Sequence, residues 1–228
     1  MALNLKYDDR KIFWGNEGLL VGKIDTTGAK PTATDIKLAT GMVSASAMED
    51  QAETANFPAD NKPDHGSKKG STLLQGEMVF MQIDEPVGEG LLGQVKSENG
   101  LGWVPTGNYT DHIVQYVNRA MKKTADGEVI NGYKIIVYPA LKATGEGTSE
   151  SETDSVDGVD PIQYTIPLQA TASTAYKSGN YQPAEMKYEV WGAQAEEFEK
   201  MMEEKLFIMF PDTVIAGGTV EPTPEETK

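Results

Sequence analysis

The chain of 228 residues contains no cysteine. This absence excludes disulfides, thiolate nucleophiles, zinc ribbons and iron–sulfur ligation, but it leaves the cellular compartment open. Basic residues are also scarce, because 20 lysines and arginines stand against 35 acidic residues and give a formal net charge of -15. A protein that clamps nucleic acid needs clustered lysine and arginine to neutralise phosphates, so the charge argues against that class of function.

Long apolar runs are missing too. No stretch approaches the roughly 20 apolar residues that span a bilayer. The opening from Met1 to Asp9 lacks the basic start and apolar run of a secretory signal. We therefore expect a soluble, acidic protein that is made in the cytoplasm. Its length is about one and a half times a typical domain of roughly 150 residues, which predicts one domain with long insertions or a small appendage.

Apolar and polar residues alternate with period two in several segments, which predicts strands with one buried face. The clearest is Ile162–Ala170, and its expected partner is Tyr133–Leu141. Each segment holds a proline, Pro167 or Pro139, which cannot donate to a ladder and so marks an edge, a bulge or a solvent-facing site. Two such prolines suggest a sheet with free edges. Further strands are expected at Lys11–Trp14, Leu19–Ile24, Glu77–Ile83, His112–Arg119 and Glu185–Trp191.

About seven strands joined mostly without helices predict a mainly β fold, an antiparallel β-sandwich or barrel. One flanking α-helix is expected over Ala193–Leu206, where apolar residues recur at three- and four-residue steps and glutamates cover the other face. A second, short helix is possible over Val87–Val95, although three glycines weaken it.

Three segments are too polar for a core and are expected to be long loops or tails: Ala47–Ser71, Ala143–Asp160 and Ala216–Lys228. A structureless loop of 25 residues inside a compact domain is uncommon and usually functional. The second segment holds six acidic residues and no basic ones, so we expect it to be mobile. We expect one β domain over residues 1–215 and a flexible C-terminal arm or linker over residues 216–228.

The run Gly88–Gly93 matches the glycine spacing of dinucleotide-binding sites, and Asp111 follows at nearly the expected distance. That site needs a helix that opens at the glycines, but Ser97–Gly100 stops any helix within about two turns. No series of alternating strands and helices surrounds the motif. We interpret it as a glycine-rich connection and expect no cofactor.

Other candidate chemistry is weaker. Asp154, Asp157 and Asp160 lack the ligand spacing of a calcium loop. The two histidines, His65 and His112, form neither a metal pair nor an acid–base dyad. No serine lies in a nucleophile elbow. We expect no metal site, no catalytic residue and no enzyme activity.

The order of the parts carries more information than any single residue. An early strand pair precedes Ile36–Ser46, which leads into a polar loop that contains Ala55–Asn61. Then come, in order, the strand Gly76–Ile83, the short segment Pro86–Gly93, the long strand Tyr133–Lys142, the acidic loop, the strand Gln163–Thr171 and a closing tail. This order resembles the major tail protein, the tail-tube subunit of long-tailed bacteriophages with non-contractile tails.

The resemblance implies a tail-tube-like β fold with a flanking helix, six copies closing into a hexameric ring, and rings stacking into a tube. DNA and the tape-measure protein would pass through that tube, and tail-tip and terminator proteins would be further partners. The location would be the virion tail, assembled in the bacterial host cytoplasm. The long early loop, here Ala52–Lys69, would reach the adjacent ring. Its expected contacts are Phe57, Pro58, Asp60 and Asn61.

Free strand edges invite pairing with neighbouring copies, and we assign that contact to Tyr164, Ile166 and Leu168. A lumen lined by carboxylates would repel phosphate and let DNA slide without specific binding. The alternative is a carbohydrate- or cell-surface-binding β-sandwich module that stacks sugars on its tryptophans. Glycan binding without self-assembly would favour that alternative.

Overall fold

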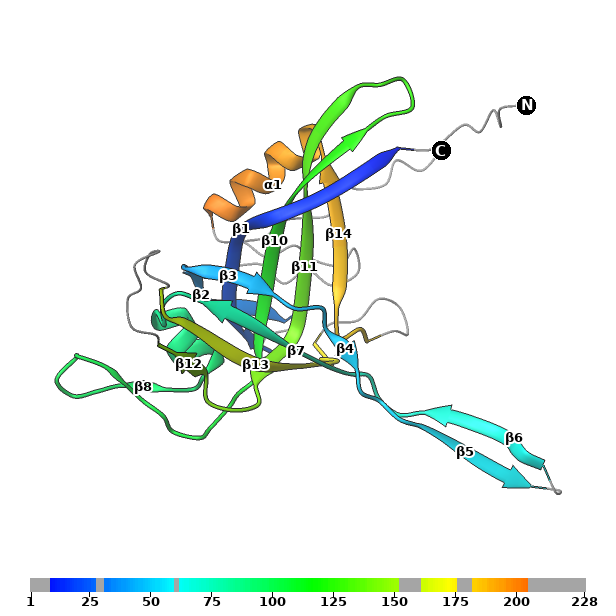
Figure 1. Cartoon of the computed structure of the whole chain (residues 1–228), viewed down its shortest axis with the longest axis horizontal. Coiled ribbons are helices and arrows are strands. Elements are labelled where there is room, and N and C mark those ends of the chain that lie inside the picture. Colours follow the sequence, from blue (N-terminus) through cyan, green and yellow to red (C-terminus); the bar gives the residue numbers. More distant parts are fainter. Residues whose placement is uncertain (1–8, 28–30, 60–61, 152–160, 176–181, 205–228) are drawn as a thin grey trace.

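The computed structural model describes residues 9–27, 31–59, 62–151, 161–175 and 182–204. It is mainly β, as the alternating segments predict (Figure 1). Ten of the described strands form one curled antiparallel sheet, in which the main path runs β2-β1-β10-β11-β13-β7-β3 and β12, β14 and β4 pair alongside. These strands are β1 (Arg10–Asp25), β2 (Thr32–Ala39), β3 (Met42–Ala45), β4 (Glu49–Asp50), β7 (Leu73–Phe80), β10 (His112–Lys123), β11 (Val129–Ala143), β12 (Thr148–Glu150), β13 (Gln163–Thr171) and β14 (Met186–Trp191).

Four further strands form two small antiparallel pairs, β5 (Thr54–Ala59) with β6 (Lys62–Lys69) and β8 (Val95–Lys96) with β9 (Trp103–Val104). The helical elements are η1 (Pro86–Leu91), a short π-helical turn, and α1 (Ala193–Glu203). The short helix expected near residue 87 is therefore this π-helical turn. The amphipathic helix is confirmed from residue 193 to residue 203.

Alternation along the long strands builds a core on each face of the sheet. The inner core lies within the curl of the sheet and includes Leu19, Phe80 and Leu168, with Leu91 of η1 packed into it. The outer core lies under α1, where Phe198 joins apolar side chains from the opposite face of the same strands: Leu20, Ile113, Val117, Ile135 and Val137. β1, β10 and β11 contribute side chains to both cores. These three strands therefore connect the inner core to the outer core, which holds α1 on the sheet.

Beyond these cores the sheet continues as a four-stranded end, made of residues 10–14 of β1, 119–123 of β10, 129–134 of β11 and 189–191 of β14. A register shift between Trp14 and Gly18 separates the two parts of β1. The two early strands expected from the sequence are therefore the two halves of one bent strand.

Both strand prolines lie where a strand changes partners. β11 pairs with β14 through residues 132–137 and with β13 through residues 140–143, and Pro139 lies between these two stretches. It also lies in a bulge, where the pairing with β10 shifts between His112 and Val114. Pro167 lies between the residues of β13 that pair with β12 and those that pair with β11. A missing donor is tolerated at such positions, so the bulge interpretation holds for Pro139.

Two predictions from the sequence are wrong. The segment Ala47–Ser71 is not a structureless loop, because it forms β4 and the β5–β6 hairpin. β13 is not an edge strand, because β7 pairs along Tyr164–Thr171 on one side while β12 and β11 pair on the other. The expected pairing of β11 with β13 is present, over four residue pairs. The acidic aspartates 154, 157 and 160 and the C-terminal segment 216–228 lie outside the described residues.

Candidate functional site and assembly surfaces

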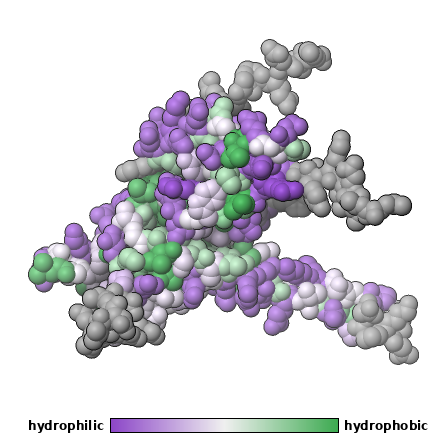
Figure 2. Space-filling model, turned by 45° about the horizontal axis from the view of Figure 1, so that its top comes forward, coloured by the Kyte–Doolittle hydropathy of each residue, from purple (hydrophilic) through white to green (hydrophobic). Residues whose placement is uncertain are grey.

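The β5–β6 hairpin (Thr54–Lys69), here called the projecting hairpin, stands away from the body of the molecule (Figure 1). Its base is held by backbone hydrogen bonds from Gln51 to Leu73 and from Gly70 to Glu53, at 2.8 and 2.9 Å. An ion pair between Lys69 and Asp50 adds to this anchor. Figure 2 shows the hairpin as a mostly hydrophilic projection. It therefore protrudes from a fixed base without a core of its own.

Two of the loop contacts expected from the sequence lie on this hairpin and are exposed. The Phe57 side chain is 55% exposed, and Pro58 beside it is exposed as well. Asp60 and Asn61 lie outside the described residues. A large apolar side chain that stays in solvent on a projecting strand is typical of a surface that another molecule covers.

The residues assigned to a sheet edge are placed differently. Ile166 and Leu168 are buried in the inner core, and Tyr164 is half-buried on the same interior strand. The edge assignment of these three residues is therefore wrong. Sequence reasoning identified their buried face correctly but not their neighbours in the sheet.

Two unpaired edges lie at the four-stranded end. β2 pairs with β1 only from Leu19 to Asp25, so Lys11–Trp14 has no strand on its outer side among the described residues. Among the described strands, β14 pairs only with β11, so its other side is also unpaired. Because the pairs β1–β10, β10–β11 and β11–β14 are all antiparallel, β1 and β14 run in opposite directions. The β14 edge of one copy thus matches the β1 edge of the next in direction.

One face of the four-stranded end carries lysines interleaved with aromatic rings. Lys11 and Lys122 lie 5.8 and 5.4 Å from the centre of the Trp191 ring, and Lys134 lies 5.1 Å from that of Phe13. Lys11 also pairs with Glu189. Such contacts stabilise a solvent-facing sheet surface by cation–π attraction. This face is therefore not a carboxylate lining.

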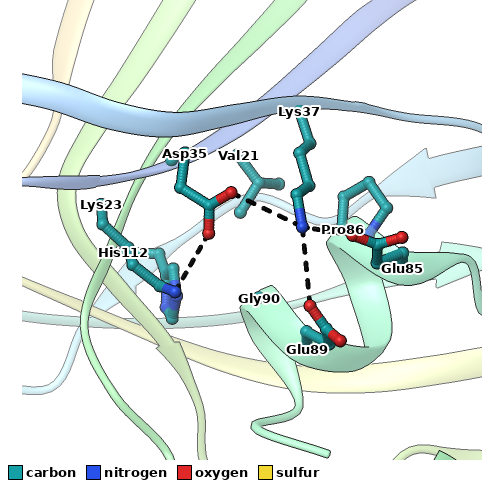
Figure 3. A pocket seen from close by; sticks show the side chains of 10 residues that line it. Val21, Lys23, Asp35, Lys37, Glu85, Pro86, Glu89, Gly90 and His112 are labelled. Carbon is teal, nitrogen blue, oxygen red and sulfur yellow. Dashed lines mark hydrogen bonds and ion pairs between the residues drawn. The ribbon is translucent and has the colours of Figure 1, made fainter. Parts of the chain in front are cut away.

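A cluster of charges fastens η1 to β2 around a small cavity of about 20 Å³ (Figure 3). Lys37 lies in the middle, paired with Glu85 and lying 3.5 Å from both Asp35 and Glu89. The hydrogen bond with Glu85 raises the pKa of Lys37 above its ordinary value. Asp35, which has a positive φ of 52°, also accepts a bond from Lys23 at 3.0 Å, and this bond lowers the pKa of its carboxyl group.

His112 lines the same cavity and is 2% exposed. Its Nδ1 lies 2.9 Å from the carbonyl oxygen of Thr110, while Nε2 has no hydrogen-bond partner among the described residues. Burial lowers the pKa of the imidazole. Burial thus favours the neutral ring, which lies with Val21 of the inner core around the small cavity.

The glycine-rich run around η1 has a packing explanation. A Cβ on Gly88 would meet the Trp103 ring at 3.0 Å, and one on Gly90 would meet Val21 at 2.9 Å. Gly93 has a φ of +58°, and the backbone of Asn108 leaves no room for a side chain there. These positions need glycine for close approach, which agrees with the interpretation as a connection.

Comparison with known proteins shows the family of this chain. A family model described as phage tail tube protein matches residues 1–217. The chain belongs to the phage tail tube protein family. It is 53% identical to the tail tube proteins of Lactococcus phages p2 and SK1 over 218 residues, which cover 95% of this chain and 72% of each relative. The tail tube protein of Lactococcus phage F4-1 matches to the same extent.

A tail tube protein is a structural component of the virion tail, so the resemblance drawn from the order of the parts is confirmed. Within the described residues no helix is long and apolar enough to cross a membrane. Sequence reasoning singled out Phe57 and Pro58, which stay predicted contacts, but it missed the hairpin that carries them and both free edges of the four-stranded end. The edges follow from long-range pairing, which no local pattern in the sequence encodes.

Proposed function

We propose that this tail tube protein self-assembles into hexameric rings that stack into a tube, an anionic conduit for DNA during infection. The observation that carries the proposal is the family match over residues 1–217. Relatives that share the tail-tube description over 95% of the chain favour it over the carbohydrate-binding alternative. The tape-measure protein and the tail-tip and terminator proteins are the further partners in this proposal.

Ring closure uses the free edges of the four-stranded end. Pairing of β14 in one copy with the first half of β1 in the next continues the antiparallel alternation across the boundary. Such a head-to-tail contact uses two different surfaces and closes into a ring when the rotation between copies permits it. Unpaired backbone groups on both edges supply the hydrogen bonds.

Stacking of rings uses the projecting hairpin, with Phe57 and Pro58 as contacts to the adjacent ring. An isolated two-stranded hairpin is marginally stable in water, so contact with the next ring would order it and bury Phe57. The ordering cost keeps free subunits apart until a tail tip provides a surface on which to grow.

The net charge of -15 supports the passage of DNA without binding. A conduit with surplus carboxylates repels the phosphate backbone and offers no basic clamp. The described lysines of the four-stranded end are largely engaged with Trp191, Phe13 and Glu189. The acidic surplus must therefore be carried by other surfaces.

Negative-stain electron microscopy of the concentrated protein, with light scattering for its mass, tests the proposal. The protein is examined alone and after addition of tail tips from a phage that lacks its own tube subunits. Six-membered rings or hollow tubes are expected in at least the seeded sample. A protein that stays monomeric in both samples contradicts the proposal.

A hairpin deletion tests the stacking step. Thr54 and Lys69 are paired across the hairpin base, so an Asn-Gly turn can replace residues 55–68 without straining the body. The variant is expected to fold as a monomer and to form no tubes. Tubes of normal length from this variant would remove the hairpin from the stacking contact.

A further inference from the structure

A groove of about 710 Å³ crosses the four-stranded end on the face that α1 covers only in part. Its floor comes from β1, β10 and β11, and one wall comes from the beginning of α1. The contact between Phe198 and Tyr133, with ring centres 5.6 Å apart, marks where the helix still covers the sheet. Beyond Tyr133 the same face is open to solvent.

Large apolar side chains are exposed on this open face. Trp14 and Val129 line the groove and are 44% and 55% exposed, and Ile12, two residues before Trp14 and therefore on the same face, is 56% exposed. Three large apolar side chains at one sheet end form a patch of the kind that a partner covers. The patch lies beside the β1 edge, one of the two free edges of the four-stranded end.

Carboxylates surround the patch. Glu17, Glu128, Glu196 and Glu199 line the groove, with Arg119 as the basic residue among the lining side chains. Arg119 is already paired with Glu17, and Glu199 accepts a hydrogen bond of 2.6 Å from Tyr133, which raises the pKa of that phenol to about 12. Glu128 and Glu196 form no ion pair with any described residue. The groove is therefore apolar on its floor and acidic on its rim.

The projecting hairpin has the complementary chemistry. Residues 54–69 contain Lys62, Lys68 and Lys69 against Asp60 and Asp64, in a chain where acids outnumber bases 35 to 20. Lys69 already pairs with Asp50 at the hairpin base, which leaves Lys62 and Lys68 on the projecting part. Phe57 provides one large, exposed apolar side chain. A hairpin that presents Lys68 and an aromatic anchor fits an apolar groove with an acidic rim.

The two surfaces also lie at opposite ends of the molecule. Figure 1 shows the hairpin leaving one end of the body, while α1 and the β10–β11 turn that flank the groove lie at the other. A hairpin cannot reach the groove of its own chain across that span, but it can reach the groove of a copy stacked on it. Contacts between unlike surfaces at opposite ends generate an open stack.

We propose that this groove receives the projecting hairpin of a second copy from the adjacent ring, with Phe57 packed against Trp14 and Val129 and with Lys68 near the unpaired Glu196. The proposal rests on the stacking of rings proposed above and names the surface that receives the hairpin. The contact would give the stack of rings a direction, because each copy inserts a hairpin at one end and accepts one at the other.

Cross-linking tests the contact directly, because the chain has no cysteine and engineered thiols have no competitors. The variant with Lys68→Cys and Glu196→Cys is assembled on tail-tip seeds under reducing conditions and then oxidised with copper phenanthroline. A ladder of covalent multimers is expected on a denaturing gel from tubes and not from monomers. The matched control pairs Lys68→Cys with Glu203→Cys, which lies on the same helix about 10 Å further along.

The outcomes separate the groove from the tube itself. Tubes that give no ladder from the first pair, or an equal ladder from the control pair, overturn the groove proposal while the tube function stands. Absence of tubes from the unmodified protein on seeds overturns the tube function instead. A ladder confined to the first pair supports both.

A charge swap provides a second test without oxidation. Glu196→Lys and Lys68→Glu are each expected to lower the yield of sedimentable tubes about tenfold, because each places like charges opposite one another. The double variant should recover most of that yield. Glu203→Lys is the control for the same charge change outside the groove, and an equal loss there, or no loss from Glu196→Lys, would contradict the proposal.

Discussion

The body and the projecting hairpin are both antiparallel β-structure, yet different forces hold them. The body buries large apolar side chains on both faces of its long strands, such as Phe80 inside the curl and Phe198 under the helix. The hairpin exposes its one phenylalanine and is fixed to the body at its base only. Burial of apolar area stabilises the body, whereas the hairpin gains such burial only from another molecule. The stacking role proposed for the hairpin would therefore make stability and assembly separable in this chain.

The largest expected change in stability comes from comparing two alanine substitutions, one of a phenylalanine in the body and one of a phenylalanine in the hairpin. Phe80→Ala removes a fully buried side chain from the inner core and should lower the free energy of unfolding by about 3–5 kcal/mol. Phe57→Ala should change it by less than about 0.5 kcal/mol, because that side chain is already in solvent. Urea denaturation followed by tryptophan fluorescence measures both changes. In the electron microscopy assay we expect Phe57→Ala to form no tubes, although its stability is unchanged.

Equal destabilisation by the two alanines would contradict the separation of stability from assembly. So would tubes of normal yield from Phe57→Ala. The double variant serves as a check, because distant sites with no shared partner add in free energy.

The second largest change in stability is expected from replacing a glycine of the body, with a glycine of the hairpin as its control. A Cβ on Gly132 would lie 2.1 Å from the backbone oxygen of Val190 and 2.7 Å from the Trp191 ring, so Gly132→Ala must push β14 away from β11. We expect a loss of about 1–3 kcal/mol in the free energy of unfolding. Gly66→Ala in the hairpin meets no atom within 4 Å and should leave the thermal midpoint unchanged. A neutral Gly132→Ala in thermal melts would show that the edge strand β14 is loosely packed.

The body could be predicted from the sequence because its strands must hide one face. Alternation in Ile162–Ala170 and the helical spacing of Phe198 and Met202 record that requirement directly. The hairpin buries nothing, so its strands show no alternation and were expected to be loop. Alternation of apolar and polar residues indicates that one face of a strand is buried. A strand that is exposed on both faces shows no such alternation in its sequence.

Neighbours in the sheet could not be predicted in the same way. Ile166 and Leu168 were expected to share a face, and both are buried, but Pro167 between them suggested an edge. The proline instead occupies the gap between two successive partner strands, where no ladder donor is needed. The groove was missed for a related reason, because its lining comes from β1, β10, β11 and α1, which only the fold brings together.

The charge cluster around Lys37 gives a smaller effect in the body. Lys37→Met leaves the carboxylates of Asp35, Glu85 and Glu89 facing one another without a cation between them. Because the cluster is partly exposed, we expect a loss of only about 0.5–1 kcal/mol at low salt. The loss should shrink in 1 M salt, where such charges are screened. Lys68→Met in the hairpin is the matched control in urea denaturation, and an equal loss there would contradict the role of the cluster.

The smallest effect is a slope with pH. Burial lowers the pKa of His112 in the folded protein below its ordinary value of 6.5, so the unfolded chain binds a proton more readily. Stability is unaffected well above pH 6.5 and falls as the pH drops through 6.5 towards the lowered value. His112→Gln should flatten the dependence of the urea midpoint on pH between 7 and 5, whatever it does to the midpoint itself. His65→Gln, in the hairpin, is the matched control. A slope that survives His112→Gln would assign acid sensitivity to carboxylates of the body instead.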